Sequence, residues 1–347
     1  LVHLHAGIGW EGHEIAAAAA RTGVPLIRSE HLPYLITDPG QQARYAEMSR
    51  QVAATIAVSE AVAASYRGSG LLAHAPVTIR NGIAPPAPRE GTLARFERNG
   101  ERPLLLNVGR LTAQKNQALL VDAVMLLAGR GRAVDLMLVG DGPDRAALLR
   151  HIRLVGAERY VRLMGHRDDA STLMAGGDLY VHASAFEGLP LVLLEAMAVG
   201  LPIVALSAPG VDEALDAETA WLVENANAEA LAAAIERALG DADATQKRVA
   251  AARQRQNDHF TAARMIAETR ALYAAHARKV SPIEQLRIGF IGAGGIACRH
   301  RDVLRGMEDV RIAAVFDTDR ARAQGFAEEA GAKVYEDWPA MLSSGEL

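Results

Sequence analysis

The stretch HASAFEGLPLVLLEAMAVGLP, residues 182–202, decides how this chain folds. It connects two short apolar segments, at 178–182 and 202–206, that have the length of buried strands, and its own apolar run predicts a helix over about 190–199. Strand, helix and strand in this order form the repeating unit of a parallel sheet covered by helices. The alternation runs through almost all of the 347 residues, so we predict an α/β fold of doubly wound parallel sheets.

The composition excludes several classes of protein. Half of the residues are hydrophobic and the formal net charge is −4, so the chain can form two or three domains and has no basic excess for non-specific binding to nucleic acid. The single cysteine, Cys298, excludes a disulfide framework and a cysteine-rich metal site. No run of 18 apolar residues occurs, so the sequence predicts no membrane-spanning helix.

Two stretches rich in proline, glycine or charge divide the alternating pattern. We predict domains at 1–83, 104–278 and 287–347, joined by linkers at 84–103 and 279–286. The chain begins inside a predicted strand and stops inside a predicted helix. We therefore expect a piece of a longer protein in which the first and third domains are incomplete, and we expect the isolated piece to be poorly active or unstable.

Three predicted strands of the second domain end in polar loops, at 109–116, 182–190 and 207–213. Ligands of doubly wound sheets bind at such strand ends, close to the N-termini of helices. Arg110 and Lys115 lie in the first loop, and the second loop leads into the helix that begins near Pro190. Two cations and the positive end of a helix dipole predict a pocket for a diphosphate.

Two glutamates, Glu187 and Glu195, are eight positions apart in the second loop and the helix after it. Glu195 would accept hydrogen bonds from two adjacent hydroxyls, as a ribose offers, and Glu187 would reach the hydroxyls of a sugar beyond the phosphates. In the alternative interpretation they are a helix cap and a partly exposed helix residue. The Pro-Gly pair in SAPGVDE predicts a loop that is either a turn alone or brings Gly210 and Glu213 to the ligand.

Taken together, NVGRLTAQKN, LVGDGP, EGLPLVLLEAMAVGLPIV and APGVDE resemble the family-4 retaining glycosyltransferases of the GT-B fold, which has two Rossmann-like domains. The resemblance covers about residues 1–278 and includes IRNGI (79–83), which is similar to the end of that family's N-terminal domain. It implies transfer of a sugar, with retention, from a nucleoside-diphosphate sugar to a glycan, lipid or small-molecule acceptor. It also implies that no metal is needed.

The resemblance assigns roles to individual residues. Arg110 and Lys115 would hold the donor diphosphate, while Glu195 binds the ribose and Glu187 the transferred sugar. The family often places a histidine near the cleft, where it helps to position the transferred sugar, and for this role His5 is the first candidate and His31 the second. The implied catalytic residues are Glu187, His5, Arg110 and Lys115, and the implied donor-binding residues are Gly109, Arg110, Lys115, Glu187, Gly188, Leu189, Pro190, Leu191, Val192 and Glu195.

The third domain begins with LRIGFIGAGGIACRH (286–300), a strand followed by a glycine-rich turn. Gly292, Gly294 and Ala297 have the G-x-G-x-x-A spacing of a dinucleotide-binding turn, and Asp317 ends the next predicted strand. The segment resembles the glucose–fructose oxidoreductase and inositol dehydrogenase family (Gfo/Idh/MocA), and the acid implies NAD rather than NADP. The glycines could also serve a tight turn without a ligand.

Three functions are therefore compared. The first is a glycosyltransferase of polysaccharide biosynthesis fused to the start of an NAD-dependent sugar oxidoreductase. The second is an NAD(P)-dependent oxidoreductase in which the N-terminal part only binds a nucleotide sugar, and the third is a sensor without catalytic activity. We expect the first, in the cytoplasm or at the inner face of a membrane, with a nucleotide sugar and an acceptor as partners and no nucleic acid.

Overall fold

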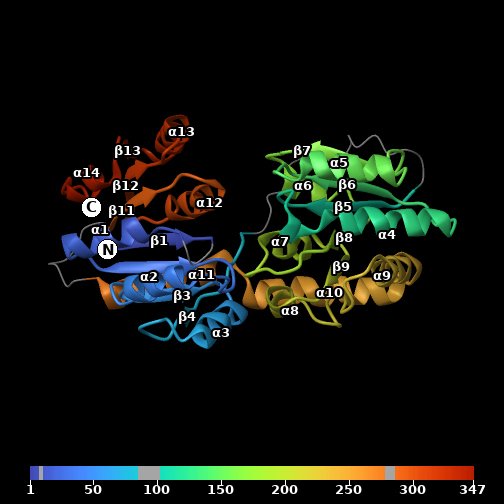
Figure 1. Cartoon of the computed structure of the whole chain (residues 1–347), viewed down its shortest axis with the longest axis horizontal. Helices are drawn as coiled ribbons and strands as arrows, with labels where there is room; N and C mark the ends of the chain where they lie inside the picture. The colour runs from blue at the N-terminus through green and yellow to red at the C-terminus, as the bar shows by residue number, and fades with distance from the viewer. Residues whose placement is uncertain (8–10, 85–101, 278–285) are drawn as a thin grey trace. The chain divides into compact units, whose positions relative to one another are not determined.

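The computed structural model describes residues 1–7, 11–84, 102–277 and 286–347 (Figure 1). They form two compact units, one of residues 1–79 and 266–347 and the other of residues 80–265. Apart from residues 84, 102, 103 and 286, the two predicted linkers lie outside the described residues. None of the helices in the described ranges is both long enough and apolar enough to span a bilayer.

The second unit contains a six-stranded sheet in the order β10-β9-β8-β5-β6-β7, and its strand pairs are parallel. The strand order reverses between β5 and β8, which are neighbours in the sheet but far apart in the sequence. Such a reversal opens a crevice at the carboxyl ends of the two strands. The strands are β5 (Leu104–Val108), β6 (Asp135–Val139), β7 (Val161–Gly165), β8 (Leu179–His182), β9 (Ile203–Leu206) and β10 (Trp221–Val223).

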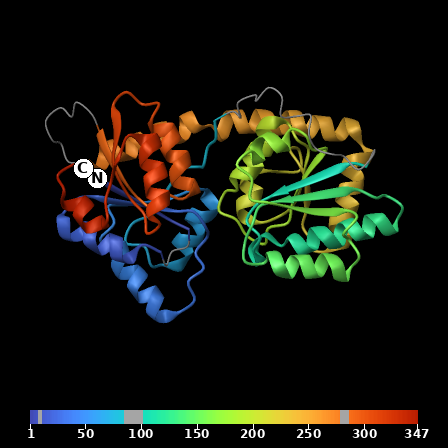
Figure 2. The same cartoon turned by 90° about the horizontal axis from the view of Figure 1, so that it is seen from above.

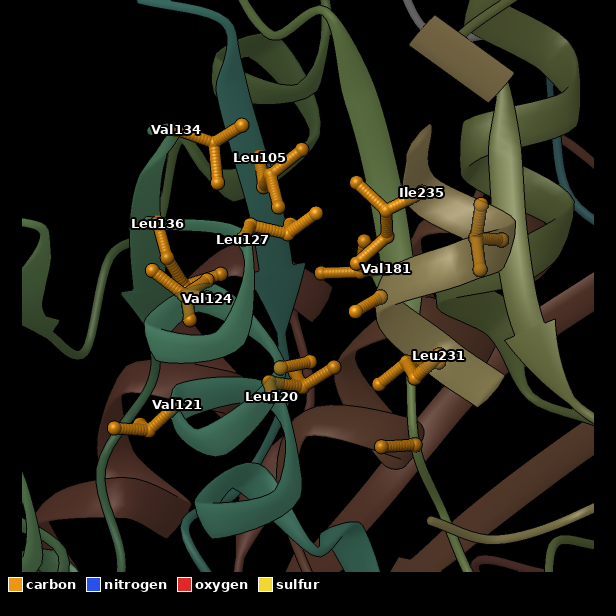
Figure 3. Close-up of a cluster of buried hydrophobic side chains, with 14 of the residues drawn as sticks. Leu105, Leu120, Val121, Val124, Leu127, Val134, Leu136, Val181, Leu231 and Ile235 are labelled. Atoms are coloured by element: carbon orange, nitrogen blue, oxygen red, sulfur yellow. The ribbon is translucent and has the colours of Figure 1, made fainter. Parts of the chain in front are cut away.

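Helices cover both faces of this sheet, with α4 and α9 on one side of the strands and α6 and α7 on the other (Figures 1 and 2). Leu105 and Val181 of the sheet pack with Val124 of α4 and Ile235 of α9 in a buried apolar cluster (Figure 3). The elements are η1 (Ala113–Lys115), α4 (Gln117–Gly129), α5 (Arg145–Leu154), α6 (Ala170–Met174), α7 (Leu191–Val199), α8 (Pro209–Ala214), α9 (Ala228–Gly240), α10 (Ala242–His259) and α11 (Ala262–His276), the last of which continues into the first unit.

One expectation for the second unit is wrong. SAPGVDE is not a loop, because Pro209 begins helix α8 and Ala208 is its N-cap. Proline fits the first turn of a helix, because an N–H at that position has no intrahelical acceptor and its loss costs nothing. Gly210 and Val211 are buried, so the segment is part of the packed layer rather than an exposed turn.

The first unit contains two smaller parallel sheets, in the orders β1-β2-β3-β4 and β11-β12-β13. Ser59 caps α3 by accepting a hydrogen bond from the N–H of Val62 at 3.1 Å, as its position before the helix predicts. The elements are β1 (Val2–Ala6), α1 (His13–Thr22), β2 (Leu26–Glu30), α2 (Pro39–Ser49), β3 (Ala54–Ala57), α3 (Glu60–Ser69), β4 (Val77–Thr78), β11 (Leu286–Ile291), α12 (Gly295–Leu304), β12 (Val310–Phe316), α13 (Arg320–Ala330), β13 (Lys333–Val334) and α14 (Trp338–Ser343).

A charged pair lies at the centre of the first unit, on strand β2. The side chains of Arg28 and Glu30 are fully buried and are joined at 2.5 Å. Tyr45 and Tyr66 donate hydrogen bonds to the Glu30 carboxylate at 2.9 and 3.0 Å, and Arg28 donates to the Glu11 carbonyl at 2.6 Å. A buried carboxylate is tolerated when it is paired and hydrogen-bonded in this way. The predicted α/β fold with parallel sheets is confirmed in both units.

Candidate functional site

Two loops meet where the strand order of the six-stranded sheet reverses. The first follows β5 and the second follows β8. Gln114 of the first loop donates a side-chain hydrogen bond to the Phe186 carbonyl at 2.9 Å, and its own carbonyl accepts one from the N–H of Ala185 at 2.8 Å. These two bonds hold together segments that are about 70 residues apart in sequence. They bring Lys115 and Glu187 to the same place.

Lys115 and Glu187 form an ion pair, in which Nζ of the lysine donates to Oε1 of the glutamate. The Glu187 side chain is 6% exposed and that of Lys115 is 20% exposed, so only the lysine retains appreciable contact with solvent. Asn116 follows the lysine with φ +50° and turns the chain from η1 into α4. The structure thus joins two residues that the sequence places at a shared ligand.

His182, the last residue of β8, is a third member of this group, and the sequence prediction missed it. Its Nε2 lies 3.5 Å from Oε1 of Glu187, and its side chain is 2% exposed. In the part of the chain that the structure describes, neither ring nitrogen has a hydrogen-bond partner. The available signal was its position at the start of HASAFEGLP, where a strand pattern ends in a titratable residue.

The charges of this group follow from its burial and its contacts. Burial alone would raise the pKa of Glu187, but the contacts with His182 and Lys115 outweigh it and lower the pKa to about 2. Burial also lowers the pKa of His182, and the opposing effect of Glu187 is smaller. At neutral pH the group therefore contains an ionised carboxylate, which pairs with Lys115, and a neutral imidazole.

Glu195 lies in the second turn of α7 and is buried, with 9% of its surface exposed. Tyr180, on β8, donates a hydrogen bond from its hydroxyl to the Val108 carbonyl at 3.1 Å. Burial raises the pKa of this tyrosine, and the charges of Glu195 and Glu187 raise it further. Both carboxylates act on the same phenol, so both glutamates lie near Tyr180.

The backbone between the two glutamates is held by contacts from other segments. Asn81 donates a side-chain hydrogen bond to the Leu189 carbonyl at 3.1 Å. A Cβ on Gly210 would lie 2.4 Å from the carbonyl oxygens of both Glu187 and Gly188, so α8 packs directly on the loop. Gly188, Leu189 and Pro190 are buried, while Leu191 and Val192 are half-buried.

The N–H groups of Leu191 and Val192 have no intrahelical acceptor, because they belong to the first turn of α7. The N-cap residue, Pro190, makes no side-chain hydrogen bond to them. Arg110 is exposed and forms no ion pair with the residues that the structure describes. A side chain at Gly109 would meet the aliphatic part of Lys115 at 3.8 Å.

Other candidates have contacts of their own. Arg80 donates to Glu213 at 2.6 Å, which ties the IRNGI segment to α8. His5 and His31 belong to the first unit, where Nδ1 of His5 lies 2.9 Å from Nε2 of His31. Among the described residues, no group of three or more histidine, cysteine or acidic side chains is placed to hold a metal ion.

The glycine-rich turn of the third sheet is built around Asp317. Gly292 has φ +96°, a conformation that favours glycine, and Gly294 is the N-cap of α12, whose first turn contains Ala297. The Asp317 carboxylate accepts hydrogen bonds from the N–H groups of Ala293 at 2.7 Å and Asp319 at 2.8 Å. The acid and the glycine turn are therefore adjacent, as their spacing predicts.

Comparison with known proteins identifies two parts of the chain. Residues 102–241 match the family model described as glycosyl transferases group 1. This segment is a group 1 glycosyltransferase domain. Residues 286–347 match the NAD-binding Rossmann fold of the Gfo/Idh/MocA oxidoreductase family. Both resemblances predicted from the motifs are confirmed, and the glycosyltransferase domain contains the Lys115, Glu187, Glu195 and His182 group.

The relatives of this glycosyltransferase domain are only moderately similar. The chain is 32% identical over 149 residues to the lipopolysaccharide core biosynthesis glycosyltransferase LpsE of Rhizobium meliloti, covering 43% of each chain. It is 32% identical over 203 residues to the glycogen synthase of Mycobacterium tuberculosis, covering 58% of this chain and 48% of the relative. The chain thus spans less than half the length of either relative.

Solved structures share the fold. The crystal structure of Anabaena HepE in complex with UDP has a TM-score of 0.68 and 22% identity, and the match covers 79% of each chain. A glycosyltransferase from Rickettsia africae also has a TM-score of 0.68, at 20% identity, and the match covers 81% of this chain and 78% of the other. At these identities the likeness shows the fold alone, and it confirms the predicted GT-B type.

Proposed function

We propose that the protein is a retaining glycosyltransferase that uses a nucleoside-diphosphate sugar and that its donor site is the group around Lys115 and Glu187. The observation that carries the proposal is the ion pair between these two residues at the carboxyl ends of β5 and β8. A cation and a buried carboxylate, placed where a doubly wound sheet binds its ligands, suit a donor that has both phosphates and sugar hydroxyls. HepE, which shares the fold, was solved with UDP bound.

In this proposal the residues have separate tasks. Lys115, Arg110 and the first N–H groups of α7 bind the diphosphate, Glu195 accepts hydrogen bonds from the ribose, and Glu187 binds the sugar that is transferred. Negative charge develops on the diphosphate as it leaves. Cations and a helix N-terminus that are already in place stabilise this charge without reorganising, and this is the main source of rate acceleration that the site offers.

Binding of nucleoside diphosphates to the 347-residue chain tests this proposal. UDP, GDP and ADP are titrated calorimetrically, and a panel of nucleotide sugars is tested for hydrolysis. We expect one diphosphate to bind and Glu195→Ala to weaken its binding by about 10- to 100-fold, the range for hydrogen bonds to a charged group. The control is Glu229→Ala on the exposed start of α9, which should bind like the unmodified chain. Equal affinity of the two variants would contradict the proposed ribose contact.

We further propose that residues 286–347 bind a dinucleotide, NAD in preference to NADP. A Cβ on Gly292, Gly294 or Gly295 would meet no atom within 4 Å, so the turn leaves room for a pyrophosphate. The turn and Asp317 would hold the two halves of NAD, which supplies hydride-transfer chemistry when bound. Binding of NAD and of a nucleotide sugar, without any release of the sugar from that nucleotide, would support the alternative function, an oxidoreductase with a sugar-nucleotide module.

A further inference from the structure

Oxygen Oε1 of Glu187 has two nitrogen neighbours that differ in charge. Lys115 donates to it, and Nε2 of His182 lies 3.5 Å away. His182 is buried, and apart from this long contact with Glu187 its ring nitrogens have no hydrogen-bond partner within the described residues. A buried imidazole whose contacts are this weak is unfavourable unless the site gains something from it in another state. The Glu187 carboxylate therefore pairs with Lys115 in this state, and His182 is placed to pair with it in another.

We propose that a nucleoside diphosphate draws Lys115 from Glu187 to its phosphates, and that His182 takes up a proton at Nε2 and becomes the new partner of Glu187. This inference rests on the proposed function, because it requires a diphosphate beside Lys115. One ammonium group cannot neutralise both the buried carboxylate and a diphosphate. The proton comes from the buffer, so the site gains one positive charge when the ligand brings its negative charges.

Among the titratable groups that surround it, His182 is the residue best suited to take up the proton. Glu187 and Lys115 act on it electrostatically, and the ring of Tyr180 stacks against it with centroids 6.2 Å apart. Tyr180 is already bonded to Val108, and both its burial and the neighbouring carboxylates keep it protonated. An imidazole ordinarily takes up a proton near pH 6.5, well above the pH at which a carboxylate does, so of these two groups the imidazole is protonated first.

The exchange makes the position of Glu187 depend on the donor. In the resting pair, Lys115 occupies the carboxylate. After the exchange, the imidazolium on β8 holds Oε1 from the buried side, which leaves Oε2 for the hydroxyls of the sugar. His182 would then be a positioning residue, because it acts on the donor only through Glu187.

The test is calorimetric titration of the 347-residue chain with UDP, or with whichever diphosphate binds, at pH 7.5 in buffers of different ionisation enthalpy. The slope of the heat against ionisation enthalpy gives the number of protons taken up. We expect about one proton for the unmodified chain, and an affinity that rises by up to about tenfold for each pH unit lowered between 8.5 and 7. His182→Gln can still donate to Glu187 but cannot titrate, so we expect no uptake and no pH dependence.

Lys115→Gln provides a second test, in case His182→Gln does not fold. Without the lysine, His182 is already protonated in the free chain, so binding should be weaker and should take up no proton. Lys247→Gln, on exposed α10, is the matched control and should keep the uptake. Diphosphate binding without proton uptake, or uptake that persists in His182→Gln, would overturn this inference and leave the proposed function standing. Failure of every diphosphate to bind would overturn both.

Discussion

Replacing Gly210 by alanine should damage the donor site without touching any of its charged residues. A Cβ at this position would lie 2.4 Å from the backbone oxygens of Glu187 and Gly188, whereas ordinary contacts of a Cβ begin at 3.4 Å. The loop or α8 must therefore move by about 1 Å, the difference between these distances. The obstacle is backbone, so no side-chain rotation relieves it.

A displacement of this size predicts the loss in rate. Misplacing a group by about 1 Å can cost on the order of 100-fold in rate. This corresponds to about 2.7 kcal/mol of transition-state stabilisation. Overpacking costs a further 1 to 3 kcal/mol of stability, roughly, if the helix cannot shift. Both effects come from the loop that holds Glu187.

The assay is the release of nucleoside diphosphate from the nucleotide sugar that the chain hydrolyses, with circular dichroism to confirm folding. Gly129→Ala is the matched control, since a Cβ at the end of α4 would meet no atom within 4 Å. We expect Gly210→Ala to be about 100-fold slower than this control. A folded Gly210→Ala variant with activity within about twofold of the control would refute the argument that the loop position controls the site.

Three further predictions concern the first unit. Burial lowers the pKa of His3 and His31 to about 3 and of His300 to about 4, so between these values and about pH 6.5 the folded state binds fewer protons than the unfolded chain. The stability measured by urea unfolding should therefore be full above about pH 6.5 and fall toward pH 4, and an unchanged stability between pH 7 and 5 would contradict this. Glu30→Gln should cost about 3 to 5 kcal/mol of unfolding free energy because it removes the negative charge beside the buried guanidinium of Arg28. Exposed Glu60→Gln should cost less than about 1 kcal/mol, and equal losses would count against the buried network. Asp317→Asn should loosen the glycine turn and weaken NAD binding about tenfold relative to exposed Asp309→Asn, as measured by fluorescence titration. Unchanged NAD binding would contradict the proposed contact between Asp317 and the cofactor.

Much of the fold follows from local sequence signals. Helix α7, at Leu191–Val199, lies within one residue of the range 190–199 expected from its apolar pattern, and Ser59 caps α3 as its type and position predict. These features depend on neighbours within a few positions, and a single sequence contains that information. Strands β8 and β9 each begin one residue after the expected segments 178–182 and 202–206 and end where those segments end, for the same reason.

The parts that were missed depend on residues far apart in sequence. His182 sits in an apolar strand pattern, and only the folded loop brings Glu187 beside it. Helix α8 was expected to be a loop because the Pro-Gly pair is a local turn signal, whereas its packing on the Glu187 loop is a tertiary contact. The shared location of Lys115 and Glu187 was predictable from the rule for strand ends. Their ion pair was not, since it depends on β5 and β8 being neighbours.

The most direct test of the donor site compares a nucleoside diphosphate with its parent nucleoside, because the two ligands differ only in the phosphates that Lys115 and Arg110 are proposed to bind. Calorimetry on the 347-residue chain should show the diphosphate binding at least about 100-fold more tightly. Most of that difference should disappear when both cations are replaced by alanine. Equal affinity for the two ligands, or a preference that survives the double replacement, would contradict the proposal that these residues hold the donor's diphosphate.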